Sequence, residues 1–340
     1  MLEQRVLTIY QKSIVINFSI LSKVWYLAHT FPLSKRDALA INSCVFRFLW
    51  RGMYQPIKRA TLCLPKAKGG LGIIDVYHKA LAILCCTVLK AIANDSCLAI
   101  YYCRMRISYL IQTKDIKELS YVSNSYYSIA IMVIRKVIRC KNFPSLSNKI
   151  VYNCICPDIQ PVVNSNYPLF NWEQIWKNVN NSFIGLRERE FLYRYIHETL
   201  ATNKRLKMLK IKTDSACDRC GQEETSIHIF YTCPFIKDIL LWFQEVLFKL
   251  CNVEKNSYLK IFMLDFRCKT KKISNVALVL IVDYLYVLWV SKKKDYSCEK
   301  ILSFLKSKIV YSRWLLGYLL NIKMKTYFDM KYINYDFNQV

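Results

Sequence analysis

The chain has 340 residues, of which 50 are Lys or Arg and 24 are Asp or Glu, so its formal net charge is +26 at pH 7. Hydrophobic residues make up 54% of the sequence and aromatic residues 14%, which excludes a disordered protein and allows two domains with separate cores. The positive charge favours a polyanionic partner, most often a nucleic acid. Lys, Ile, Asn and Tyr are also residues that an AT-rich coding sequence produces without selection for binding.

Cysteine usage and apolar patterning predict the cellular compartment. The 15 cysteines have no regular spacing, and the residues after Met1 lack the features of a secretory signal. We therefore expect reduced thiols and an intracellular location, in the nucleus or cytoplasm. The longest apolar run, residues 276–290, is shorter than the roughly 20 residues of a membrane span and has Asp283 at its centre. It predicts a buried helix and no membrane partner.

Residues 1–95 have apolar positions at helical spacing and predict a small helical bundle. One helix should begin after Ser34 as its N-cap and stop at Gly52. A basic, glycine-rich turn at residues 64–72 could bring backbone amides and lysines close to a phosphate backbone. It lacks the spacing of a nucleotide-binding P-loop, so by itself it predicts only a loop.

Residues 96–184 are less periodic, contain several prolines and predict a variable connector. Within it, Cys154 and Cys156 have no partners at metal-ligand spacing, so we expect them to be free thiols. An amphipathic helix should follow over residues 187–200. Thr202 then caps a second, basic helix that is expected to run to Ile211. We expect nucleic-acid contacts from the basic residues of this segment, which are Lys204, Arg205, Lys207, Lys210 and Lys212.

The next segment contains the motif Cys217-x2-Cys220-x7-His228-x4-Cys233 in a chain with only four histidines. Three thiols and one imidazole are a donor set for tetrahedral Zn²⁺, and four protein ligands leave no position for a catalytic water. The motif therefore predicts one structural zinc ion per chain. Two alternatives are a chance CxxC beside an ordinary core histidine, and a thioredoxin-like redox turn. The second needs a βαβ context and leaves His228 and Cys233 without a role.

Gly221 can supply the positive φ of a metal-binding turn, and Pro234 can open the helix after Cys233. Two further helices are predicted over residues 273–327, and residues 296–340 form a C-terminal helical extension. The predicted fold class is mainly α.

Two blocks of this sequence resemble LINE-type (non-LTR) retrotransposon reverse transcriptases. The first resembles the thumb and post-thumb region and comprises Ile20–Leu27, Phe31–Leu33, Phe48–Trp50, Ile57, Lys58, Leu64, Pro65 and Gly69–Gly72. The second resembles the C-terminal zinc-binding domain and comprises Arg194–His197, Leu200–Thr202, Leu206, Cys217, Cys220, His228–Phe230, Cys233, Pro234 and Trp242.

The resemblance implies a helical thumb-like bundle, a connector, and a helical domain at residues 185–295 that carries a small CCHC zinc knuckle. It implies zinc ligation by the four motif residues. It also implies binding of RNA or DNA, such as element RNA or target DNA, with phosphate-backbone contacts from Lys58, Lys66 and Lys68. Solvated loop charge is an equally good reading of these three lysines.

The resemblance is incomplete at the polymerase centre. A polymerase needs paired carboxylates, and no two aspartates are adjacent in this sequence. The family's palm and endonuclease domains would precede Met1. We therefore expect no catalytic residues and a catalytically incomplete C-terminal fragment that binds nucleic acid. A zinc-stapled helical scaffold without nucleic-acid binding is the alternative, and an active polymerase or nuclease would need carboxylates that converge in a cleft.

Overall fold

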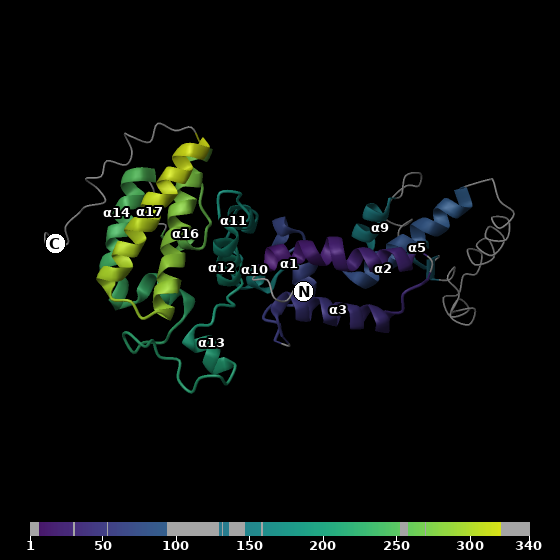
Figure 1. Ribbon diagram of the computed structural model, residues 1–340, viewed down its shortest axis with the longest axis horizontal. Helices are drawn as coiled ribbons and strands as arrows, with labels where there is room; N and C mark the ends of the chain where they lie inside the picture. Colours follow the sequence, from purple (N-terminus) through teal and green to yellow (C-terminus); the bar gives the residue numbers. More distant parts are fainter. Residues whose placement is uncertain are drawn as a thin grey trace. The chain divides into compact units, whose positions relative to one another are not determined.

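The computed structural model divides the chain into two compact units, shown as a ribbon in Figure 1. Unit 1 comprises residues 1–65 and 69–160, and unit 2 comprises residues 66–68 and 161–340. The residues that the structure describes are 7–29, 31–52, 54–93, 129–130, 132–135, 147–157, 159–251, 258–268 and 270–320.

Helices are the only regular elements in the described ranges, apart from one isolated antiparallel bridge. The prediction of a mainly α fold is confirmed.

Unit 1 is built around helix α5, which packs against α2, α3 and α9. The predicted cap is present, since the Ser34 hydroxyl accepts a hydrogen bond from the Asp37 amide at the start of α3. The described helices of this unit are α1 (Ile9–Val15), the π-helical η2 (Ile16–Ile20), α2 (Leu21–Ala28), α3 (Lys35–Trp50), α4 (Arg59–Cys63), α5 (Val76–Ala93) and α9 (Asn148–Ile155).

The buried Lys12 ammonium connects α1 to the C-terminal end of α3. It donates to the carbonyls of Phe48 at 2.8 Å and Leu49 at 3.0 Å, where the helix dipole favours a cation. The predicted stop at Gly52 was wrong by one residue, because Arg51 takes the left-handed conformation with φ 57°.

The glycine-rich turn closes by close backbone contact within unit 1. The Gly72 amide donates to the Leu64 carbonyl at 2.9 Å. A Cβ on Gly70 would lie 1.9 Å from the Leu64 carbonyl oxygen, so only glycine fits there.

Unit 2 is organised around the long helix α16, which packs against α12, α14 and α17. In Figure 1, α14, α16 and α17 lie side by side. The Tyr284 ring of α16 stacks on Phe243 with centroids 4.3 Å apart, and its hydroxyl donates to the Phe230 carbonyl at 3.0 Å. The elements of unit 2 are η3 (Lys66–Lys68), α10 (Val162–Asn166), α11 (Trp172–Val179), α12 (Leu186–Ile196), α13 (Asn203–Met208), η4 (His228–Thr232), η5 (Pro234–Ile236), α14 (Lys237–Cys251), α15 (Tyr258–Phe262), α16 (Lys271–Lys293) and α17 (Cys298–Leu320).

Two predicted helix ends were wrong because charged residues adopt left-handed backbone conformations. The amphipathic helix predicted to reach Leu200 ends at Ile196, and Glu198 has φ 54°. The basic helix predicted to reach Ile211 ends at Met208, and Lys210 has φ 57°. Its predicted cap is present, because the Thr202 hydroxyl accepts from the Arg205 amide.

Among the described residues, only the segment Ile273–Lys293 of α16 is long and apolar enough to span a membrane. Of its most apolar window, 78% is buried inside the protein, which agrees with the buried helix predicted around Asp283.

The predicted connector, residues 96–184, contains α9, α10 and α11 in its described part. Its limits, and those of the other predicted domains, stay predictions. Neither Cys154 nor Cys156 forms a disulfide. Residues 321–340 of the predicted C-terminal extension lie outside the described residues.

Candidate metal centre

A short hairpin presents the first two thiols of the motif. Ala216 and Glu223 form an antiparallel bridge, and the Cys217 amide donates to the Gln222 carbonyl at 2.7 Å. The chain reverses between them because Gly221 has φ 76°, as its position after the CxxC predicted. The turn therefore places Cys217 and Cys220 on one side of the hairpin.

A π-helical turn presents the imidazole and the third thiol. The His228 amide donates to the Thr225 hydroxyl at 3.0 Å, and the Cys233 amide donates to the His228 carbonyl at 2.9 Å. This hydrogen bond spans five residues and brings both side chains to the same end of the turn. Pro234 follows at the first position of η5, where its fixed φ suits a helix start.

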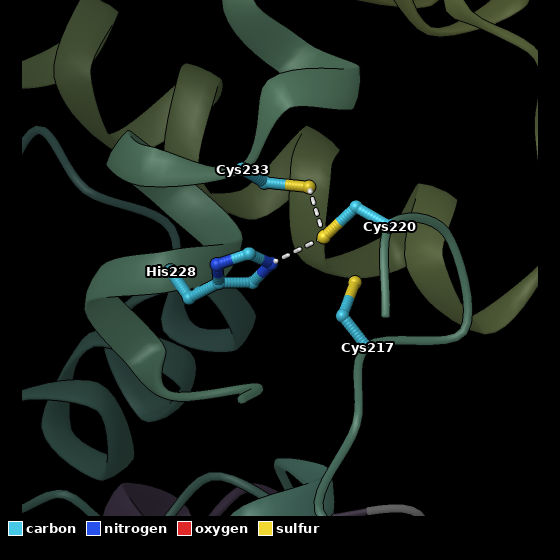
Figure 2. A group of neighbouring side chains, drawn as sticks. All are labelled: Cys217, Cys220, His228 and Cys233. Carbon is cyan, nitrogen blue, oxygen red and sulfur yellow. Dashed lines mark hydrogen bonds between the residues drawn. The ribbon is translucent and has the colours of Figure 1, made fainter. Parts of the chain in front are cut away.

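The four side chains point toward a common centre (Figure 2), and their ligand atoms all lie within 4.8 Å of one another. The Sγ atoms of Cys220 and Cys233 are 3.8 Å apart, and Cys220 Sγ is 3.2 Å from His228 Nε2. Two thiolates on a tetrahedral Zn²⁺ with Zn–S bonds of about 2.3 Å are themselves about 3.8 Å apart. The donor set and its spacing therefore fit a zinc ion.

Burial changes the pKa values of the imidazole and of one thiol in the cluster. Burial lowers the pKa of His228, with Glu224 acting in the opposite direction, so the neutral imidazole that binds metals is favoured. Burial raises the pKa of the Cys233 thiol. A bound cation would act in the opposite direction, because a metal ion deprotonates a coordinating thiol.

The two alternative readings of the CxxC leave the imidazole and the third thiol outside any cluster. The structure brings both to the CxxC turn, and that turn lies in a hairpin. Four protein donors fill a tetrahedral site and leave no coordination position for a catalytic water, so a metal ion bound here would stabilise the fold.

A buried carboxylate connects the hairpin to two helices. Glu224 is 1% exposed, accepts a hydrogen bond from the Asn203 amide at 2.7 Å and forms an ion pair with Lys292 of α16. The Asn203 side chain donates to the Ala216 carbonyl at 2.6 Å, beside the first thiol. These contacts fix the start of α13 and the end of α16 against the candidate metal centre.

Arg219, between the two thiols of the CxxC, forms a second attachment to α16. Its guanidinium donates to the carbonyls of Ser291 at 3.2 Å and Tyr296 at 3.3 Å, and it lies 4.3 Å from the Phe235 ring centroid. Sequence reasoning did not identify Arg219, Glu224 or Asn203. Glu223 and Glu224 are adjacent acids, and nothing in the sequence distinguishes the buried one from the exposed one.

The predicted nucleic-acid contacts differ in how far they are engaged within the protein. Lys204 pairs with Glu223 at 2.9 Å, and Lys212 pairs with Asp218 at 3.6 Å. The Arg205 guanidinium donates to the Glu198 carbonyl at 2.5 Å.

The remaining predicted contacts are exposed lysines. The side-chain ammonium groups of Lys207 and Lys210 form no ion pair or hydrogen bond within the described parts of the chain. Lys58 is exposed just before α4, and Lys66 and Lys68 are exposed in η3.

Residues 147–242 match the protein-family model described as zinc-binding in reverse transcriptase. The matched segment contains all four clustered side chains and helix α13. It supports a reverse-transcriptase zinc-binding domain in this part of the chain, as the second block of the resemblance predicted. Comparison with curated proteins gives no match.

Proposed function

We propose that this chain provides a zinc-stabilised surface that binds the phosphate backbone of RNA or DNA. The observation that carries the proposal is the position of the Cys3His cluster. It lies in a segment similar to reverse-transcriptase zinc-binding domains and is joined through Asn203 and Glu224 to the basic helix α13. The formal charge of +26 supports a polyanionic partner.

The proposal includes an origin in a LINE-type retrotransposon, in which residues 1–95 correspond to the thumb and post-thumb region. In that setting the partners are element RNA or target DNA, and the protein acts inside the cell. The chain would not catalyse polymerisation, because the sequence has no adjacent aspartates of the kind that hold the two metal ions. A primer-extension assay with Mg²⁺ and all four nucleotides tests this, and extended primer would contradict it.

Salt-dependent filter binding tests the nucleic-acid surface. Single-stranded RNA and duplex DNA should be retained at low salt and lost as salt rises, because lysine–phosphate contacts release counterions. Changing both Lys207 and Lys210 to Ala should weaken retention and reduce the salt slope by about 2. Lys237→Ala, at another exposed position of unit 2, serves as the matched control. Absence of retention at low salt would refute the proposal.

The metal is tested separately. We expect one Zn²⁺ per chain by elemental analysis, and Cys220→Ser should abolish it and loosen residues 205–250 in hydrogen exchange. Cys44→Ser changes an exposed thiol outside the cluster and should leave the zinc content unchanged. Equal zinc content in the two variants would remove the ligand assignment.

A second candidate function is a zinc-stapled helical scaffold. It is favoured by the pairing of Lys204 and Lys212 with acids of the hairpin, because these charges are partly neutralised within the protein. The scaffold predicts intact zinc binding together with no retention of nucleic acid at any salt concentration.

A further inference from the structure

The end of helix α13 exposes apolar side chains among exposed lysines. We name residues 207–211 the α13 tip. Met208 is 76% exposed and Ile211 is 68% exposed. Burying such side chains against a partner would be favourable through the hydrophobic effect. Their exposure beside the candidate metal centre therefore indicates a surface for a partner.

The α13 tip is held in one conformation by its own backbone. The Ile211 amide donates to the Leu206 carbonyl at 2.9 Å, and the Lys210 amide donates to the Lys207 carbonyl at 2.9 Å. With Lys210 at φ 57°, these are the two hydrogen bonds of a Schellman motif. Both apolar side chains are therefore presented by a fixed turn, and little conformational entropy is lost when they contact a partner.

The charge around the α13 tip indicates a polyanion. The ammonium groups of Lys207 and Lys210 are exposed and pair with no acid in the described residues, whereas Lys204 and Lys212 are paired with Glu223 and Asp218. Positive charge is thus available on the same turn as Met208 and Ile211. In such an arrangement the lysines can contact phosphates, and the apolar side chains between them can contact base edges in a groove.

The chemistry of the exposed side chains favours a duplex over a single strand. Surfaces that bind single strands stack successive bases on aromatic rings, and the α13 tip has none. Met and Ile are among the apolar residues that proteins insert from the minor groove between base steps of duplex DNA, which unstacks the step and kinks the helix.

We infer that the α13 tip is a wedge for duplex DNA, in which Met208 and Ile211 enter a base step while Lys207 and Lys210 contact the flanking phosphates. This inference rests on the proposed nucleic-acid function and adds the substrate class and the way it is engaged. The candidate metal centre would hold the wedge in position through Asn203, whose amide groups bind Glu224 and the Ala216 carbonyl.

The experiment combines filter binding with a duplex that carries 2-aminopurine, whose fluorescence rises when its base step unstacks. The full zinc-loaded chain should bind the duplex and raise the fluorescence several-fold. The double variant Met208→Ala/Ile211→Ala should still bind, within about tenfold of the parent affinity because the lysines remain. When the duplex is saturated with this double variant, its fluorescence should stay at the level of the free duplex. Leu169→Ala removes another exposed apolar side chain of unit 2, 91% exposed, and should behave like the parent.

Retention of the duplex without a fluorescence rise would overturn the wedge and leave the proposed function standing. The same holds if the double variant raises the fluorescence as much as the parent. Absence of retention would overturn both. A different result would assign the α13 tip to an anionic membrane surface instead. In that case the parent would bind phosphatidylserine vesicles, the double variant would not, and neither protein would change the fluorescence of the duplex.

Discussion

The ion pair between Glu224 and Lys292 should contribute far more to stability than its neighbour between Glu223 and Lys204. The Glu224 and Lys292 side chains are 1% and 18% exposed, whereas those of Glu223 and Lys204 are 54% and 47% exposed. Removing one partner of a buried pair costs about 3–5 kcal/mol, because a desolvated charge loses its compensation. An exposed pair is screened by water and salt and contributes about 0–1 kcal/mol.

The expected decrease in the free energy of unfolding for each substitution follows from the contacts of the Glu224 carboxylate. Glu224→Gln keeps an oxygen that can accept from the Asn203 amide, and Lys292 can still reach water, so we expect a loss of about 2 kcal/mol. Glu224→Ala also leaves the buried Asn203 amide without its acceptor, which raises the expected loss to about 4 kcal/mol. Glu223→Gln, the matched control one residue away, should cost less than about 0.5 kcal/mol.

Urea unfolding at fixed free Zn²⁺ would measure the free energy of unfolding, and hydrogen exchange of residues 203–212 and 222–226 would show where protection is lost. A double-mutant cycle of Glu224→Gln with Lys292→Met isolates the coupling between the two side chains. The reasoning is refuted if Glu224→Gln and Glu223→Gln have equal free energies of unfolding within about 0.5 kcal/mol, since burial would then not separate the two pairs.

Three further predictions concern a glycine, a buried carboxyl group and the α13 tip. Gly221→Ala meets no atom within 4 Å but must keep φ 76°, so its cost is backbone strain of about 1–2 kcal/mol, and zinc affinity in chelator competition should fall about tenfold. Gly52→Ala, equally open and without a positive φ, should change nothing. Burial raises the pKa of Asp283 from 3.8 to about 7, so the folded state binds the extra proton and stability should decrease as pH rises from about 4 to about 7. Asp283→Asn should flatten this slope in urea midpoints measured between about pH 5.5 and 7.5, and an unchanged slope would contradict the assignment. Lys210→Gly should raise the free energy of unfolding by about 1 kcal/mol, because glycine tolerates the left-handed conformation, and should lower the salt slope of DNA binding by about 1. Lys207→Ala should lower the salt slope of DNA binding by the same amount without raising the free energy of unfolding.

The features that the sequence predicted well are those with a local physical cause. The caps at Ser34 and Thr202, the turn at Gly221 and the helix start at Pro234 each depend on a few neighbouring residues. The clustering of the four motif side chains belongs to this group, because they come from one short segment of the chain. Their ligation of zinc stays a prediction.

The features that the sequence did not predict depend on distant partners or on disfavoured conformations. Glu224 and Lys292 are 68 positions apart, and nothing local distinguishes Glu224 from its exposed neighbour. The helix ends at Arg51 and Lys210 place charged residues in a conformation that usually selects glycine. Propensity alone extends such helices further, so the prediction for α13 reached Ile211 and missed the turn that exposes the α13 tip.

A zinc ion at the Cys3His cluster and the Glu224 carboxylate would hold different parts of unit 2, so their effects on the α13 tip should be separable. The four cluster side chains come from the hairpin and the π-helical turn, which a bound zinc ion would join, whereas Asn203 and Glu224 join the hairpin to α13. Loss of zinc should loosen the hairpin first, and the α13 tip should lose its order only as a consequence. Loss of the Glu224 carboxylate releases the start of α13 while all four ligands stay in place. A variant such as Glu224→Ala would then keep its zinc and lose ordered presentation of Met208 and Ile211, so zinc content and DNA unstacking would change independently.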